Sequence, residues 1–414
     1  MAFRHFLTRW GSISVWQHRP VRVCARHDPP SARRPASRGE TFRQARCGKF
    51  RREFYCAFRK SFLPLHQGKT GIMRETPLFR TPVSAAPSAR PIQPHEGCVA
   101  LGSCFAQEMG TRMDEHGLRV LCNPLGTLYN PASIALLVHH AMEGGTGHLP
   151  LFETRGRWRC WLAGTQVEGE SRADITAMVA SRLEQLGQAL RSAAHLIVTL
   201  GTSVCYRLRD SGEVVANCHK MPASLFQEDS LTTGQCADVL TGMVGELLRV
   251  NPHLNVTFTV SPYRYAKYGY HRSQLAKATL LLAVDEVCRR QEEASYFPAY
   301  ELLLDELRDY RFYADDMLHP SPLAADYIWQ RFCQSRLSAR AKDYVREYEP
   351  IRKGLAHRPS DPGSAQYRAF RQALEARRGE LRKKYGFPCA PEGDGTRTVC
   401  TQQNNPPTHY VHNI

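Results

Sequence analysis

Ser103 is the first residue of this chain whose type and position could support chemistry. It follows a short apolar run at 97–101 and precedes Phe105, Met109 and Met113, which recur at helical spacing. This order predicts a buried strand, a tight turn and a helix, with Ser103 at the carboxyl end of the strand, where open α/β sheets bind ligands. The amides of the first helical turn would favour a developing negative charge there. An ordinary turn in which Ser103 only caps the helix fits the same residues.

A second reactive pair, Asp316 and His319, lies more than two hundred residues further along the chain. Pro320 and Ser321 follow it and predict the start of a helix over 323–337. An Asp in a turn can accept a hydrogen bond from Nδ1–H of a His three residues later, which fixes the tautomer and stabilises the imidazolium. A polar turn ahead of a helix would have the same residues. If both segments reach one sheet edge, Ser103 becomes the nucleophile, His319 the base and Asp316 its orienter.

The elements that must position these residues follow from hydrophobic periodicity. Short apolar runs predict five strands, at 97–101, 119–122, 195–200, 255–260 and 294–298. Amphipathic helices are expected between them, at 174–193, 232–250 and 273–293, the last with an apolar surface of Leu275, Leu281, Leu282, Val284 and Val287. This alternation predicts a three-layer α/β/α fold with a doubly wound, mostly parallel five-stranded sheet of the flavodoxin-like kind. Residues 204–217 predict a small hairpin insertion.

Polar turns follow several of the predicted strands. Asn130 closes a loop rich in Pro and Gly after the second strand, and Thr202 and Ser203 follow the third. Asn217 and His219 come after the hairpin, where a lone His beside a Lys is expected at the surface. Such residues could line a site at the sheet edge or serve as ordinary turn formers.

Residues 102–106 spell Gly-Ser-Cys-Phe-Ala, which resembles the motif of the GSCFA family, a family similar to a branch of the SGNH/GDSL-type hydrolases. Further matching motifs occur in the family's order at 123–131, 200–202, 217–220, 261–262, 296–301 and 316–320. The resemblance covers roughly residues 73–335 and does not cover residues 1–72 or the C-terminal tail.

The resemblance implies Ser103 as nucleophile, His319 as general base and Asp316 as its orienter. It implies an oxyanion hole made by the N–H groups of Ser103 and Gly126 with a donor from the turn at Thr202 and Ser203. Hydrolases of this kind usually carry an Asn where this chain has Ser203, and losing one such donor raises the barrier by roughly 3 kcal/mol. Other candidate donors or substrate-binding residues are Asn130, Asn217 and His219. Cys104 is a rival nucleophile that ranks below Ser103.

Charge and composition divide the chain. Residues 1–72 hold 16 of the 55 Lys and Arg but 3 of the 39 Asp and Glu, so most of the net charge of +16 lies there and does not indicate that the globular part binds nucleic acid. We expect 1–72 to be a disordered basic segment: an arm, a transit peptide or, as we favour, sequence upstream of a true start near Met73. We expect a hydrolase domain at 73–337, a charged helical extension at 338–385 and a disordered tail at 386–414.

Several classes of protein are not indicated. The 14 Cys form no CxxC pair and no Cys/His cluster with zinc spacing, which predicts reduced thiols in the cytoplasm and no metal. The sequence contains no run of about 18 apolar residues, so we expect no membrane-spanning segment. The glycine-rich motifs that bind nucleotide phosphates are missing, so no cofactor is expected.

The sequence therefore predicts a serine-dependent hydrolase acting on ester bonds, with a small-molecule or carbohydrate ester as substrate. One alternative is an acyltransferase on the same site, with an acceptor groove walled by Trp158, Trp161 and Tyr129. Another is a catalytically silent binding module that keeps the fold. The sequence indicates no oligomeric state.

Overall fold

A computed structural model describes residues 80–144 and 149–388 of the 414-residue chain. The segment 1–72, the proposed start at Met73 and the tail from residue 389 onward lie outside the described residues, so the predictions made for them stay predictions.

The central sheet has five strands, and every neighbouring pair is parallel. The strands are β1 (Gly97–Gly102), β2 (Arg119–Cys122), β6 (His195–Leu200), β10 (Asn255–Val260) and β11 (Ala294–Tyr296). Their order is β11-β10-β6-β1-β2, which is the order 2-1-3-4-5 found in flavodoxin-like sheets. The direction of winding reverses between β1 and β6, and ligands of such sheets bind at the carboxyl ends of the strands on either side of that point. All five predicted strands are confirmed.

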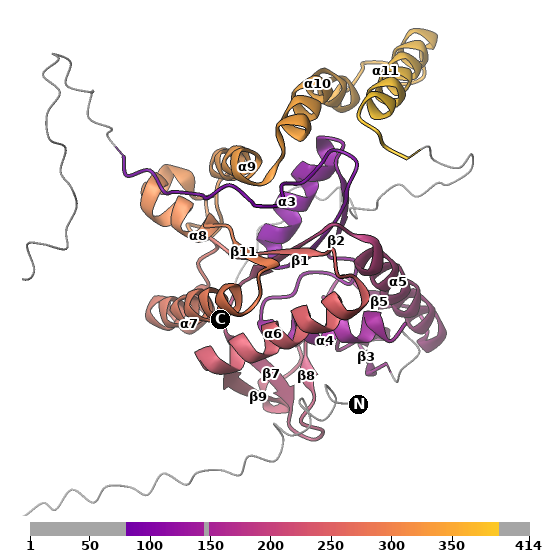
Figure 1. The fold of residues 1–414 in the computed structure, drawn as a ribbon. Coiled ribbons are helices and arrows are strands. Elements are labelled where there is room, and N and C mark those ends of the chain that lie inside the picture. Colours follow the sequence, from indigo (N-terminus) through magenta and orange to yellow (C-terminus); the bar gives the residue numbers. More distant parts are fainter. Residues whose placement is uncertain (1–79, 145–148, 389–414) are drawn as a thin grey trace, which may run out of the picture. The chain divides into compact units, whose positions relative to one another are not determined.

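Helices cover both faces of this sheet (Figure 1), which confirms the three-layer α/β/α prediction. On one face lie α3 (Cys104–Glu115) and α9 (Pro322–Arg336). On the other lie α4 (Pro131–Met142), α5 (Arg172–Ser192), α6 (Thr233–Val250) and α7 (Tyr270–Arg290). The first face buries an apolar cluster that includes Phe105, Met109, Ile197, Phe297 and Phe332. Burial of this kind of surface is the main term that stabilises the layers.

Helix α7 buries only part of the apolar surface that the sequence predicted: Val284 and Val287 lie in the core, as expected. Leu275 and Leu282 are 55% and 60% exposed, so their predicted packing is wrong. The buried positions follow one helical phase instead: Ser273, Ala276, Lys277, Leu280, Ala283, Val284 and Val287. Several of these side chains are small, and small residues let a helix approach its neighbours closely. The prediction for Leu275 and Leu282 failed because it counted apolar residues without asking which of them share one side of the helix.

Two small antiparallel sheets lie outside the central one. The first consists of β3 (Leu151–Thr154), β4 (Arg157–Cys160) and β5 (Glu168–Gly169). The second consists of β7 (Val204–Leu208), β8 (Val214–Val215) and β9 (Phe226–Ser230), which confirms the predicted hairpin and adds a strand to it. They share a small hydrophobic cluster built on Trp161, Val215 and Phe226.

The C-terminal helices are α10 (Ala339–Ala356) and α11 (Ala365–Lys384). Tyr344, Tyr348 and Ile351 form a buried side of α10, and the Tyr344 hydroxyl donates to the Gly117 carbonyl at 3.0 Å. The charged extension is therefore anchored by buried aromatic residues. The described residues also form short helical turns: η2 (Ala223–Leu225), η3 (Ala266–Tyr268), α8 (Ala299–Glu301), the π-helical η4 (Leu302–Leu307) and η5 (Tyr310–Phe312). None of the helices in the described ranges combines the length and apolarity needed to cross a membrane.

Candidate active site

Ser103 lies directly after β1, at the point where the winding of the sheet reverses. Its side chain is 1% exposed, and its Oγ accepts a hydrogen bond from the Phe105 N–H at 3.3 Å, so it caps α3. A capping hydroxyl uses a lone pair and keeps its proton, so capping does not exclude nucleophilic chemistry. The preceding Gly102 has φ +133, and a Cβ there would lie 2.1 Å from the Thr199 carbonyl oxygen. Only glycine fits this turn.

Asn123, which follows β2, braces the same turn. Its Oδ1 accepts a hydrogen bond from the Gly102 N–H at 2.9 Å, and the residue is 4% exposed with φ 42. Its Nδ2 is buried and has no hydrogen-bond partner among the residues described. The sequence analysis used Asn123 only as part of a motif. Its place at a strand end, in a conformation that Asn tolerates better than most residues, is a signal that could have identified it.

Asp316 and His319 form the pair that their spacing predicts. Asp316 Oδ2 lies 2.5 Å from His319 Nδ1, and Asp316 Oδ1 accepts the N–H groups of Leu318 and His319 at 2.9 Å each. Burial works to raise the pKa of Asp316, but the hydrogen bonds from His319 and Leu318 outweigh it and hold the pKa below its usual value. An ionised carboxylate at Nδ1 assigns the proton to that nitrogen and leaves Nε2 as the acceptor.

The loop that carries this pair is closed by backbone hydrogen bonds. The Ala314 N–H donates to the His319 carbonyl and the Ser321 N–H to the Phe312 carbonyl, both at 2.8 Å. Ser321 then caps α9, its Oγ accepting the Ala324 N–H. The loop is thus held at both ends, although the His319 side chain remains 37% exposed.

Tyr263, in the turn after β10, packs against the candidate base. Its ring centroid lies 4.3 Å from that of His319. Burial raises the pKa of Tyr263, and the charges of Cys104, Tyr265 and Asp316 raise it further. The sequence analysis did not single it out. The signal was available, because Tyr263 is a polar aromatic residue directly after a buried strand.

Lys277 is a second residue that the sequence analysis missed. It lies on the buried side of α7, is 2% exposed and donates from Nζ to the Ser261 carbonyl at 2.7 Å. No carboxylate of the described residues forms a salt bridge with it. Burial lowers its pKa to about 7, and the charge of the Cys104 thiol opposes that shift without cancelling it. A lysine in the buried phase of an amphipathic helix is the sequence signal that identifies such a residue.

The predicted oxyanion donors already have backbone partners. The N–H groups of Ser103, Gly126 and Thr202 donate to the carbonyls of Thr199, Asn123 and Tyr129 at 3.1, 2.8 and 2.9 Å. The Thr202 Oγ1 accepts the Val204 N–H at 3.1 Å. Ser203 is 3% exposed, and its carbonyl accepts the Leu231 N–H at 3.0 Å. The roles of these groups stay predictions.

The three candidate polar residues beyond these turns have local structural partners. Asn130 caps α4, with its Oδ1 accepting the Ser133 N–H at 2.9 Å, and the Asn217 Oδ1 accepts the His219 N–H at 2.7 Å. His219 is 5% exposed, so its expected surface position is wrong. Its Nε2 lies 3.1 Å from the Cys160 carbonyl, and burial lowers its pKa to about 4. Their predicted contacts with substrate stay predictions.

Comparison with known protein families assigns the chain. The model described as the GSCFA family matches residues 98–332, more than half of the chain. The chain belongs to the GSCFA family. A second model, described as GSCFA domain protein, C-terminal domain, matches residues 348–392, so the family resemblance continues into the helical extension, beyond the limit near residue 335 that the motifs suggested. No curated protein and no solved structure matches the chain.

The aromatic groove that an acyltransferase would need is not formed as predicted in this GSCFA chain. Trp161 is 8% exposed and stacks on Phe152 with ring centroids 3.6 Å apart, so it belongs to the core of the small sheets. The guanidinium of Arg172 lies over the Trp158 ring at 5.6 Å. Tyr129 lies elsewhere: its carbonyl accepts the Thr202 N–H at 2.9 Å and its ring is 6.5 Å from that of Tyr265.

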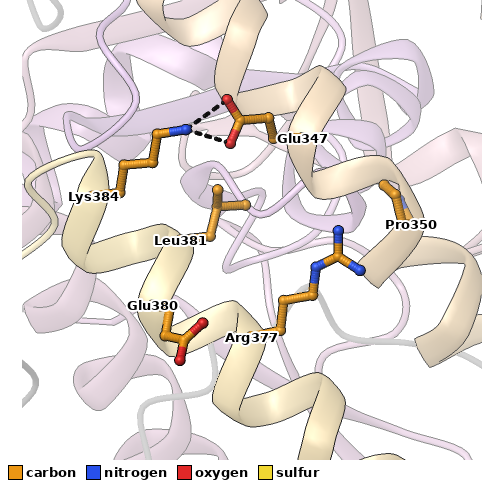
Figure 2. A pocket seen from close by; sticks show the side chains of 6 residues that line it. All are labelled: Glu347, Pro350, Arg377, Glu380, Leu381 and Lys384. Atoms are coloured by element: carbon orange, nitrogen blue, oxygen red, sulfur yellow. Dashed lines mark hydrogen bonds and ion pairs between the residues drawn. The ribbon is translucent and has the colours of Figure 1, made fainter.

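A surface hollow of this GSCFA chain lies elsewhere, between α10 and α11 (Figure 2). Leu381 and Pro350 supply its apolar side, and the Lys384 ammonium is paired with the Glu347 carboxylate at 2.7 Å. None of the predicted site residues lines it. The hollow is a feature of the C-terminal domain, separate from the candidate site.

Proposed function

We propose that this chain is a serine-dependent hydrolase acting on ester bonds, with Ser103 as nucleophile, His319 as general base and Asp316 as its orienter. The observation that supports this most strongly is the Asp316–His319 pair, with 2.5 Å between Oδ2 and Nδ1. The Asp316 carboxylate is fixed by two backbone N–H groups and holds the imidazole at Nδ1. A general base requires this arrangement to set its tautomer, whereas an ordinary surface histidine does not. The position of Ser103 at the reversal of the sheet supports the proposal independently.

The proposed reaction has two steps. Ser103 Oγ attacks the ester carbonyl carbon while its proton passes to His319 Nε2, and collapse of the tetrahedral intermediate expels the alcohol, which takes that proton. Water then attacks the acyl-enzyme with His319 again accepting a proton, and the acid is released as Ser103 regains its hydrogen. Asp316 stays ionised throughout and stabilises the imidazolium that forms in each step.

The neighbouring cysteine does not compete for this role in the proposal. Burial raises the pKa of the Cys104 thiol to about 11, and the opposing charge of Lys277 does not overcome that effect. The reactive form of a cysteine is the thiolate, which such a pKa leaves scarce at neutral pH. Ser103 needs no ionised form of its own, because the base removes its proton during attack.

The finer assignments are also proposals. A link of the GSCFA family to the SGNH/GDSL-type hydrolases is supported by the strand order and by the Ser103 and Asp316–His319 positions. The substrate class we propose is an acyl ester of a carbohydrate or another polar scaffold. A cytoplasmic location is consistent with the free thiols of the nine cysteines in the described ranges.

Covalent labelling tests the proposal directly. A fluorophosphonate probe should label the wild-type protein at Ser103, and Ser103→Ala should lose both that label and the hydrolysis of p-nitrophenyl acetate. Removing the cap bond should lower the unfolding free energy by only about 1 kcal/mol, so the variant should stay folded. A Cys104→Ser variant is the matched control and should keep the label. Equal labelling of wild type and Ser103→Ala would refute the proposed nucleophile.

One observation favours a second candidate, a catalytically silent binding module. The N–H groups of Ser103, Gly126 and Thr202 all donate to backbone carbonyls, so a hole for an oxyanion would require at least one of these bonds to open. A silent module would bind an acyl ester without hydrolysing it. Absence of fluorophosphonate labelling, together with saturable binding of the intact ester, would support this candidate over the hydrolase.

A further inference from the structure

Lys277 has surroundings that a surface-type lysine does not share. Its Nζ lies 2.7 Å from the Ser261 carbonyl and 5.7 Å from the centre of the Tyr300 ring, and the residue is 2% exposed. Within the described residues it forms no ion pair with a carboxylate. Burying an ammonium without a counter-ion is unfavourable, so a lysine kept in such a place usually does something that an apolar residue could not.

What Lys277 holds is the start of the turn that reaches the candidate base. Ser261 is fully buried, and its Oγ accepts the Tyr263 N–H at 3.4 Å. The Tyr263 ring packs against the His319 imidazole, and the next residue, Arg264, donates its N–H to the Leu318 carbonyl at 3.1 Å. The turn 261–264 therefore contacts the 316–319 loop twice, once by a ring and once by the backbone.

We propose that Lys277 is a positioning residue of the candidate site: by binding the Ser261 carbonyl it fixes the 261–264 turn, which in turn orients the His319 imidazole through Tyr263 and the backbone of the 316–319 loop through Arg264. The effect on catalysis rests on the proposed hydrolase function. The effect on the orientation of His319 does not depend on it.

The same contacts explain why His319 needs this support. Asp316 fixes which nitrogen of the imidazole carries the proton, but a single in-plane hydrogen bond lets the ring rotate about it. The Tyr263 ring, tilted by 40° to the imidazole, limits that rotation. The Tyr263 ring also lies 5.9 Å from the Tyr265 ring, which lies 6.5 Å from the Tyr129 ring, so displacement of the turn would disturb a row of aromatic contacts next to His319.

The experiment compares Lys277→Met, which keeps the chain length and removes the donor, with Lys277→Gln, which is neutral but still donates. Lys267→Met is the matched control, because Lys267 is exposed and bonds the Tyr206 hydroxyl rather than the turn. The first readout is the NMR titration of His319, assigned among the 17 histidines by comparison with His319→Asn. The second is the rate of fluorophosphonate labelling at Ser103.

We expect Lys277→Met to shift the His319 titration and to slow labelling roughly tenfold or more, because small displacements of a catalytic group have large effects on rate. With p-nitrophenyl acetate the loss should appear in kcat rather than KM. Lys277→Gln should recover part of both readouts, and Lys267→Met should match wild type. A folded Lys277→Met protein with the wild-type titration and labelling rate would overturn the proposal.

Two outcomes need separate treatment. If the wild-type protein is not labelled at Ser103, the hydrolase proposal fails, and the His319 titration alone decides the positioning role. If Lys277→Met does not fold, Tyr263→Leu and Tyr263→Phe carry the test, since Phe keeps the ring that contacts His319 and Leu removes it. Only Tyr263→Leu should then shift the NMR titration of His319. Identical His319 titrations in Tyr263→Leu, Tyr263→Phe and the wild-type protein would overturn the proposal.

Discussion

The two halves of the candidate site are held in different ways. Ser103 is 1% exposed and sits in a turn whose backbone is bonded to Thr199 on one side and to Asn123 on the other. The His319 side chain is 37% exposed and is oriented mainly by two side chains, the Asp316 carboxylate and the Tyr263 ring. One half is part of the sheet itself, and the other is a loop that returns to the sheet.

This contrast suits the two tasks that we propose. A nucleophile must sit at a fixed distance from the carbon it attacks, which a strand end provides. A base must accept a proton and give it to the leaving group, so what matters is the orientation of its ring, which neighbouring side chains can set without burial. Burial should therefore govern the stability of the Ser103 turn, whereas side-chain contacts should govern the function of the His319 loop.

The largest expected effect lies on the loop. His319→Ala should lower the rate of ester hydrolysis by roughly 10²- to 10⁴-fold, because it removes the proposed general base. Its melting temperature should stay close to that of wild type, since the side chain is 37% exposed and packs mainly against one ring, that of Tyr263. His253→Ala, at another exposed histidine, is the control and should be unchanged in both respects. If activity and melting temperature fell together, His319 would be part of the stabilising core, as Ser103 is, and the two halves of the site would not differ in this way.

The next effect lies on the strand-end turn. Gly102→Ala should reduce the free energy of unfolding by about 3 kcal/mol or more, because the added Cβ would meet the Thr199 carbonyl oxygen at 2.1 Å in a backbone conformation with φ +133. Urea titration measures this. Gly245→Ala in α6, where a Cβ meets nothing within 4 Å, should instead stabilise by roughly 0.5–1 kcal/mol. A mild effect at Gly102 would mean that the turn is less rigid than its contacts indicate.

His219 sharpens the contrast, since it is a histidine held as firmly as Ser103. Its pKa is lowered from 6.5 to about 4 by burial. As the pH falls, the unfolded chain therefore binds a proton at this position at a higher pH than the folded protein does. Stability should therefore be complete above pH 6.5 and should fall as the pH drops toward 4, by at most roughly 3 kcal/mol. His219→Asn, which tolerates the φ of +50, should flatten the dependence of unfolding free energy on pH across that window. An unchanged slope would show that His219 titrates as an exposed residue does.

The sequence predicted the sheet well and the site in part. The five strands, the cap at Ser103 and the Asp316–His319 pair are local features, because each depends on residues a few positions apart. The errors came where packing decides. Leu275 and Leu282 looked like core residues and are exposed, whereas Lys277 on the same helix is buried. His219 looked like a surface residue and lies among aromatic rings.

By itself the sequence determined where strands and helices form and which residues carry reactive groups, since periodicity and turn chemistry act over short stretches of chain. Only the tertiary structure decided that Tyr263 would lie against His319, that Asn123 would brace Gly102 and that Lys277 would be buried beneath the turn after β10. These contacts join segments far apart in the chain. They depend on how whole layers pack, and no local pattern of residues encodes the outcome of that packing.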